Sequence, residues 1–471
     1  MIKYTFNSSV AGGNTMNRIV NSIEAKDIEN HFHPYTNPQT LKETGPHVIC
    51  RGEGIYVYDN SNNKLIEGMS GLWCASLGFN NKDLVEAATK QMEKLPFYHS
   101  FAGKVPEVAA NLAEKLVGIA PAGLDKVFFC NSGSEANDTA IKVVWYYQNA
   151  LGRPEKRKII SRKRGYHGVT MVAGSLTGLP YAQDGFGLPL DFVRHTSCPH
   201  YFMEKLERES EQNFVDRMLN NLEELILEEG PDTIGAFIAE PVMGAGGVII
   251  PPENYFTKVQ ALLKKYDVLF IADEVICGFG RTGNMWGSET FDLKPDILTC
   301  AKALSSAYAP ISALLINETI ISEIENQANE LGIFGHGFTY SAHPMAAAVA
   351  LRTLEIYEEK KIVEHVRETE KSFTQRVKDF KKYDFVGDTR AIGLIGAIEF
   401  VSEPGSNKKP DPSRKVAAKI QQQIQDAGVI LRSLPGDSLA FCPPLIIEDS
   451  QIHEMFDKID SVLARIDIQI L

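Results

Sequence analysis

Three groups of residues in this 471-residue sequence have side chains or backbone groups that could do chemistry where a predicted strand ends. In the first, "FFCNSGSEAND", an apolar run leads to Ser132, Gly133 and Ser134 and then to a helical pattern. Small residues in the first turn of a helix leave backbone N–H groups free beside the positive end of the helix dipole. The stretch therefore predicts a phosphate site, although a serine that merely caps the helix would give the same letters.

The other two groups are single ionisable residues. Asp273 ends the apolar run 268–273, where a buried carboxylate is costly without a cationic partner. Lys302 follows the run 296–300 by two residues, and a lysine held partly out of water becomes a usable nucleophile for a carbonyl carbon. Taken singly, Asp273 could be a helix cap or half of a structural ion pair, and Lys302 a surface lysine. Together with the phosphate site they form the set that pyridoxal 5′-phosphate needs.

A G-x-G-x-x-G pattern, formed by Gly278, Gly280 and Gly283, suggests dinucleotide binding instead. That function requires a glycine turn that opens a helix, with an acidic residue about 20 residues further on. No helical apolar period follows Gly283, and the acidic pair Asp273–Glu274 precedes the glycines. A nucleotide-dependent oxidoreductase is therefore only a distant alternative.

Composition excludes several other classes of protein. The net charge of −12 is spread along the chain, which argues against a nucleic-acid surface. Neither a signal peptide nor a membrane-spanning stretch is predicted, and seven scattered cysteines indicate a reducing, cytoplasmic compartment. The stretch from His195 through Cys198 to His200 predicts a polar loop rather than a metal site, because no second Cys/His pair completes it. Residues 1–15 are rich in Asn, Ser and Gly, and we expect them to be loosely held.

The order of apolar and helical patterns predicts the fold class. Strands are expected at 126–130, 158–162, 170–175, 234–240, 268–274, 296–300 and 312–317. Helical patterns separate many of them, which indicates an α/β fold with a mostly parallel sheet covered by helices. We place a large cofactor-binding domain at 81–340. The two ends, 1–80 with a hairpin at 54–68 and 341–471 with a helix at 450–466, are expected to form a smaller α+β domain.

At these motifs the chain resembles the class III aminotransferases, pyridoxal-phosphate enzymes of fold type I. The similarity runs from "MSGLWCASLGF" (69–79) to "LRSLPGDSLAFCPPL" (431–445). It implies that Lys302 is the catalytic residue, bonded to the cofactor, and that Asp273 binds the pyridine nitrogen. The other cofactor-binding residues that it implies are Val275 and Tyr166 on the two ring faces, His167 beside Tyr166, Ser132, Gly133 and Ser134 at the phosphate, Glu240, and Thr339.

Thr339 resembles the family's threonine that reaches the phosphate from the partner subunit. This implies an obligate homodimer, or a dimer of dimers, with the active site at the subunit interface. The implied partners are small molecules, an amine donor and a keto-acid acceptor, and neither a nucleic acid nor a membrane.

Two details resemble one branch of the family, the amine:pyruvate or ω-transaminases. These are "SGLWC" with Trp73, and Arg432 in "LRSLPGD", a loop arginine that binds a substrate carboxylate as a bidentate pair. Ala245 stands where members that use 2-oxoglutarate commonly have a glutamate, which favours pyruvate. The substrate-binding residues implied by the resemblance are Trp73, Phe101, Ala102, Tyr166 and Arg432. Ala102 departs from the bulkier residue frequent in this branch.

The sequence thus predicts a transaminase that moves an amino group from a primary amine or ω-amino acid to pyruvate by a ping-pong mechanism, with Lys302 as general acid–base. A 2-oxoglutarate-linked class III aminotransferase and an aminomutase are the nearer alternatives. Taurine, β-alanine, a diamine and an arylalkylamine all remain open as donors.

Overall fold

The computed structural model describes residues 21–466, which form two compact units. The first unit comprises residues 21–52 and 57–64 of this range. It holds α1 (Ile23–Asn30), α2 (Pro38–Thr44) and most of β1 (Ile49–Glu53) and β2 (Tyr56–Asp59). The second unit contains every residue predicted for the site. Residues 1–15, expected to be loosely held, lie outside the described residues.

A seven-stranded sheet organises the second unit, in the order β4-β10-β9-β8-β7-β5-β6. Its strands are β4 (Leu124–Cys130), β5 (Lys158–Arg162), β6 (Val193–Thr196), β7 (Ile234–Ala239), β8 (Leu269–Asp273), β9 (Ile297–Cys300) and β10 (Ser312–Asn317). The five strands from β6 to β9 pair in parallel, and β10 is antiparallel to both of its neighbours. The predicted α/β fold with a mostly parallel sheet is confirmed.

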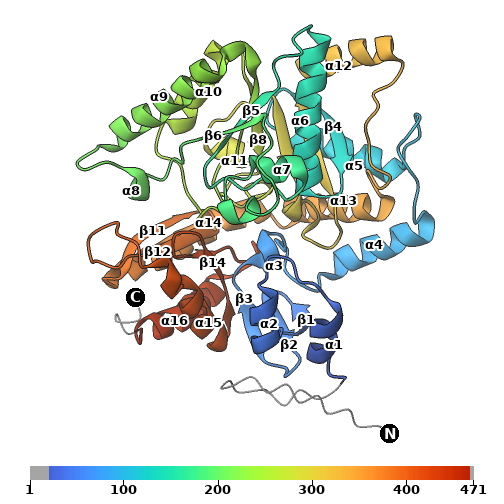
Figure 1. Ribbon diagram of the computed structural model, residues 1–471. Helices are drawn as coiled ribbons and strands as arrows, with labels where there is room; N and C mark the ends of the chain where they lie inside the picture. The colour runs from blue at the N-terminus through green and yellow to red at the C-terminus, as the bar shows by residue number, and fades with distance from the viewer. Residues whose placement is uncertain (1–20, 467–471) are drawn as a thin grey trace. The chain divides into compact units, whose positions relative to one another are not determined.

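The strands β7, β8, β9 and β10 are mostly apolar and buried because each face of the sheet is covered by helices (Figure 1). The helices around the sheet are α6 (Gly133–Ala150), α7 (Met171–Leu176), α9 (Glu211–Glu229), α10 (Tyr255–Lys265) and α12 (Glu318–Leu331). Ile238 and Ile271 pack in the apolar cluster that includes residues of α6 and α12. Their neighbours Phe237 and Phe270 pack in the cluster that includes residues of α9 and α10. This two-residue alternation decides which side chains reach α6.

One predicted strand is wrong. Residues 170–175 were expected to be extended, but α7 occupies this stretch. The carboxylate of Asp138, on α6, accepts hydrogen bonds from the Thr170 hydroxyl (2.6 Å) and from the Ala173 amide (2.8 Å). A carboxylate at a helix N-terminus satisfies a free amide and favours the helix dipole. Because this cap comes from 32 residues away, the local pattern does not reveal it.

The polar loop expected at 195–200 is also wrong in its first part. His195 lies inside β6, a strand of four residues at the edge of the sheet. Only Val193 and Thr196 of this strand are buried, so its sequence lacks the apolar run of the central strands. Such a short edge strand gives little signal in the sequence.

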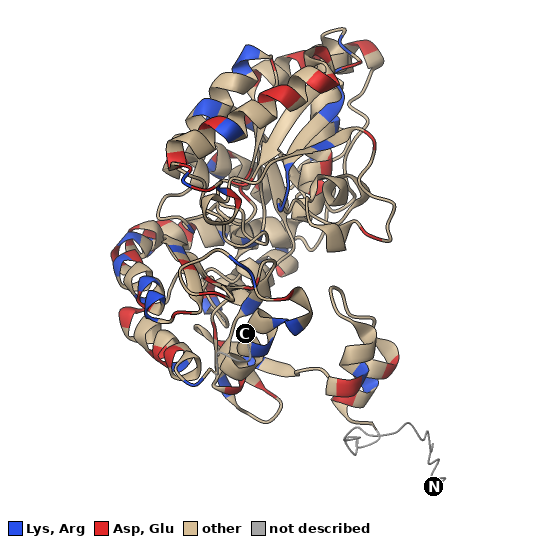
Figure 2. Cartoon of the chain, turned by 60° about the vertical axis from the view of Figure 1, so that its left-hand side comes forward, with Lys and Arg blue, Asp and Glu red and all other residues tan. Residues whose placement is uncertain are grey.

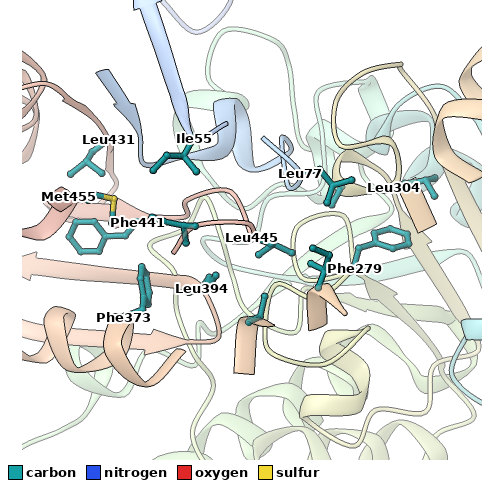
Figure 3. Packing of buried hydrophobic residues seen from close by; sticks show 14 of the residues in the cluster. Ile55, Leu77, Phe279, Leu304, Phe373, Leu394, Leu431, Phe441, Leu445 and Met455 are labelled. Carbon is teal, nitrogen blue, oxygen red and sulfur yellow. The ribbon is translucent and has the colours of Figure 1, made fainter. Parts of the chain in front are cut away.

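A second, antiparallel sheet has the order β11-β12-β15-β14. It consists of β11 (Val386–Ile392), β12 (Ile395–Phe400), β15 (Ser438–Phe441) and β14 (Arg432–Leu434), with α14 (Ile362–Asp379), α15 (Val416–Asp426) and α16 (Asp449–Leu463) beside it. Nearby, β3 (Lys64–Glu67) pairs in parallel with β13 (Val429–Ile430), which joins two distant parts of the chain. Figure 3 shows the shared apolar packing, with Phe373, Phe441 and Met455 in the same cluster as Ile55 and Leu77.

The remaining helices are shorter or connect these layers. They are α3 (Ser70–Trp73), α4 (Lys82–Lys94), α5 (Glu107–Ile119), α8 (Tyr201–Glu204), α11 (Gly287–Thr290), α13 (Pro344–Glu359) and the 3₁₀ turn η3 (Lys302–Ser305). Lysine and arginine are interspersed with aspartate and glutamate along the outer helices (Figure 2). Across residues 21–466, we find no helix with the length and apolar character needed to cross a bilayer.

Removing one ring from the sheet core should test this packing. Phe237 is fully buried, and its ring centroid lies 6.1 Å from that of Phe270. We expect Phe237→Ala to destabilise the protein by about 3–5 kcal/mol, because the cavity cannot fully collapse. A denaturant-unfolding midpoint measures the loss. Leu227→Ala is the control, since Leu227 is 54% exposed on α9, and equal shifts for the two variants would contradict the described core.

Candidate active site

A cavity of about 370 Å³ lies where β8 and β9 end and α6 begins. Parallel strands bring the residues at their carboxyl ends to one edge of a sheet, which is where ligands bind in open α/β folds. Nine predicted cofactor residues line this one cavity: Ser132, Gly133, Ser134, Tyr166, His167, Glu240, Asp273, Val275 and Lys302. The structure therefore brings together groups that lie between positions 132 and 302 of the sequence.

Asp273 is the last residue of β8, and its side chain is almost fully buried. Its Oδ2 accepts hydrogen bonds from Asn137 Nδ2 (2.8 Å) and His167 Nδ1 (2.7 Å), and its Oδ1 accepts one from the Val275 amide (3.1 Å). Within residues 21–466, no lysine or arginine forms an ion pair with this carboxylate. A buried anion without a cation of its own suits a cationic heterocycle placed in the cavity.

Lys302 begins η3, directly after the residue that follows β9. Its backbone is left-handed, with φ of 49°, a conformation that costs a non-glycine residue roughly 1–2 kcal/mol. Burial lowers the pKa of the Lys302 amine, and nearby Asp273 opposes this shift only in part. A lowered pKa increases the fraction of neutral amine near neutral pH, as a nucleophile or proton acceptor requires.

The first turn of α6 forms another wall of the cavity. Ser132 caps the helix by accepting a hydrogen bond from the Glu135 amide, and Ser134 Oγ accepts one from the Val169 amide (3.1 Å). A Cβ on Gly133 would come within 3.1 Å of the Val275 side chain. Gly168 has φ of +136°, and a Cβ there would collide with the Ser134 hydroxyl. The two glycines leave room around an 18-residue helix whose N-terminus favours an anion.

Glu240 and His167 add polar groups to the same wall. Burial raises the pKa of the Glu240 carboxyl to about 7. Its carboxylate accepts long hydrogen bonds from the Tyr166 amide (3.3 Å) and the Gly244 amide (3.4 Å). The His167 ring is fully buried, and its Nε2 has no hydrogen-bond partner among residues 21–466. Glu240 can therefore hold or release a proton near neutral pH, and His167 presents one unpaired ring nitrogen.

Two predicted residues of the substrate site, Trp73 and Arg432, lie outside this cavity. Trp73 is buried in an apolar cluster with Ile276, which does line the cavity. Arg432 begins β14 and is half-buried. Their roles toward a substrate stay predictions.

The other three predicted residues that do not line the cavity are Phe101, Ala102 and Thr339. Phe101 lines a second cavity of about 200 Å³, and its ring lies against Gly337. Ala102 has a left-handed backbone, and Thr339 is exposed. The predicted role of Thr339 requires a partner subunit and stays a prediction.

The glycine pattern that suggested a dinucleotide site has a structural role here. Glu274 points away from the cavity and accepts hydrogen bonds from the Gly287 amide and from the amide and hydroxyl of Ser288, at the start of α11. That helix has four residues and begins beyond Gly283. Arg281, inside the glycine pattern, donates to the carbonyl oxygens of Leu394 (2.9 Å) and Pro443 (2.7 Å).

Several residues of the site were not predicted from the sequence. Asn137 is fully buried beneath Asp273, although it shares a helix face with Ile141 and Val144. A polar residue on an otherwise apolar face was the signal that could have found it. Ser305, the last residue of η3, and Ile311, directly before β10, also line the cavity, and the short segment that holds them has no apolar period that would predict this.

Comparison with known proteins agrees with this geometry. Residues 39–463 match the family model for class-III aminotransferases. The γ-aminobutyrate transaminase 1, mitochondrial, of Oryza sativa subsp. japonica is 48% identical over 438 residues, which cover 92% of this chain and 85% of the relative.

Two solved structures are similar along most of their length. The ω-transaminase of Pseudomonas jessenii in complex with PMP has a TM-score of 0.92 and 49% identity, covering 94% of this chain and 98% of the other. A transaminase with L-alanine has a TM-score of 0.87 and 52% identity, covering 88% and 98%.

The residues of the cavity fit pyridoxal 5′-phosphate. A buried carboxylate that pairs with no lysine or arginine among residues 21–466 suits the pyridine nitrogen, an amine of lowered pKa suits the aldehyde, and a helix N-terminus suits the phosphate. The chain belongs to the class III aminotransferases, and it is a pyridoxal-phosphate-dependent enzyme.

Proposed function

We propose that this enzyme transfers an amino group from a primary amine or ω-amino acid to pyruvate, giving alanine, in two half-reactions at one site. The observation that carries the chemistry is that Lys302, Asp273 and the N-terminus of α6 meet in one cavity. The bound cofactor supplies an electron-withdrawing ring that acidifies the C–H bond beside the amine. Lys302 would anchor that cofactor until the substrate amine displaces it, and the freed Lys302 amine would then take the proton from the substrate carbon and return it.

The remaining cavity residues hold the cofactor in this proposal. The amides of the first turn of α6, with Ser132 and Ser134, bind the phosphate, and the Asp273 carboxylate faces the ring nitrogen. Val275 and Tyr166 pack on the two ring faces. Thr339 of a second copy completes the phosphate site, so the working unit is a homodimer or a dimer of dimers. We keep residues 81–340 as the proposed large domain.

Two observations support pyruvate as the acceptor. Ala245 is an apolar, buried residue in the loop after β7, so that position offers no acidic partner with which Arg432 could pair between substrates. The relative solved with L-alanine holds the amino acid that pyruvate becomes. The rice relative is named for γ-aminobutyrate and is mitochondrial. We therefore add this ω-amino acid to the candidate donors, and the cytoplasmic location stays a prediction.

Borohydride reduction should fix the cofactor to Lys302. We expect peptide mapping of the reduced holoenzyme to place the cofactor mass on this residue, because its amine combines a lowered pKa with a place in the cavity. Lys302→Ala should lose both the label and the turnover. Lys294→Ala, which changes a lysine with an 80% exposed side chain, should keep both. A label on any other lysine would exclude Lys302 as the anchor.

Substitution of Arg432 should separate the two half-reactions. We expect Arg432→Ala to slow the reaction of pyruvate with the aminated enzyme roughly 10- to 100-fold, the worth of hydrogen bonds to a charged group. An uncharged arylalkylamine should react with the pyridoxal form almost as before, because it has no carboxylate to bind. Rapid mixing of each form with one substrate measures the two rates.

The matched control is Arg208→Ala, which removes an arginine whose side chain is 91% exposed. The same assay should be run with 2-oxoglutarate, whose second carboxylate would need another cation. If the wild-type enzyme used both keto acids with equal efficiency, or if Arg432→Ala slowed amine and pyruvate alike, the proposed acceptor would be wrong.

A further inference from the structure

One buried amide, that of Asn137, joins three elements beneath the cavity. Its Nδ2 donates hydrogen bonds to Asp273 Oδ2 (2.8 Å) and to the carbonyl oxygen of His167 (2.7 Å). Its Oδ1 accepts a hydrogen bond from the hydroxyl of Thr299 (2.8 Å). Both partners of Nδ2 can only accept, so the amide has a single orientation.

The sheet register explains why these groups meet. Asp273 on β8 and Thr299 on β9 are direct neighbours across the two parallel strands. Both follow the two-residue alternation of Ile271 and Ile297, which pack in the cluster on the α6 side of the sheet. Asn137 lies on α6 and bonds to both of them.

Because of Asn137, the two oxygens of Asp273 differ in the number of hydrogen bonds that they already accept. A carboxylate has about four acceptor positions. Asn137 and His167 fill both positions of Oδ2, and the Val275 amide fills one of Oδ1. The remaining position is on Oδ1, and Asp273 lines the cavity. Asn137 and His167 thus determine that a further donor can bind only to Oδ1 of the carboxylate.

The chemical type of Asn137 matters as much as its position. An arginine or lysine here would neutralise Asp273 in a closed ion pair. A neutral amide donates a hydrogen bond to the carboxylate and brings no positive charge that would offset the negative charge of Asp273. The other titratable side chains that line the cavity are Tyr166, His167, Glu240 and Lys302.

We propose that Asn137 is a positioning residue: it orients Asp273 so that Oδ1 receives the proton-bearing ring nitrogen, and as a neutral amide it adds no positive charge beside Asp273. This rests on the proposed function. Thr299 supports this role, because its hydroxyl donates to Asn137 Oδ1 and so holds the amide in its single orientation.

The test is the pH dependence of the visible absorbance of the bound cofactor in the holoenzyme. In Asn137→Ala, we expect the midpoint of this titration to rise by about one pH unit. The titrating proton is on the Lys302 nitrogen that is bonded to the cofactor, and this nitrogen keeps its proton to higher pH when the ring holds less positive charge. The half-reaction with an amine should slow roughly 10- to 100-fold. Asn137→Asp should be slower still, since two adjacent carboxylates cannot both ionise. Thr299→Val should shift the midpoint in the same direction by less.

Asn149→Ala is the matched control, because this asparagine is exposed near the other end of α6 and bonds only locally, to the carbonyl oxygen of Trp145. Its midpoint should equal that of the wild type. A lower melting temperature without a shifted midpoint in Asn137→Ala and Thr299→Val would mean a purely structural role and would overturn the proposal. Borohydride mapping of the wild type comes first: an unlabelled Lys302 refutes the proposed function, whereas a labelled Lys302 with unshifted midpoints refutes only this inference.

Discussion

A negative charge is expensive to hold away from water, and most of this site follows from how the protein holds the one on Asp273. The carboxylate lies at the end of a strand whose other residues are apolar, and its donors among residues 21–466 are an amide side chain, an imidazole and a backbone N–H. Neither a lysine nor an arginine is among these donors. The protein thereby keeps a strong electrostatic partner ready for a cationic ring.

The same charge acts on its surroundings. Lys302 lies in the same cavity, where burial lowers the pKa of its amine and Asp273 raises it. The balance leaves an amine that is easier to deprotonate than an exposed lysine. Burial has the opposite effect on the carboxyl group of Glu240, whose pKa rises to about 7. The cavity thus holds a carboxyl group, Glu240, with a raised pKa and an amine, Lys302, with a lowered pKa.

The parts of this arrangement that could be predicted are those with a local cause. The central strands were visible because burial on both faces makes them continuously apolar, and Asp273 and Lys302 stood out because they interrupt that pattern. Helix α7 was missed because its cap, Asp138, comes from another helix. Asn137 was missed because its role depends on which face of α6 meets the sheet. The position of Trp73 and Arg432 outside the cavity depends on loop paths that have no sequence period.

The alternation of side chains along β7 and β8 has a consequence for how the chain finds this fold. If β8 slipped by one residue against its neighbours, Asp273 would turn from the polar groups of α6 into the layer of aromatic rings under α9 and α10. Neither Asn137 nor His167 would be there to donate to the carboxylate, so the slipped arrangement would place a poorly satisfied charge in an apolar layer. The residue on which the chemistry depends therefore also favours the correct register of β8, because a strand shifted by one residue would bury Asp273 at a free-energy cost.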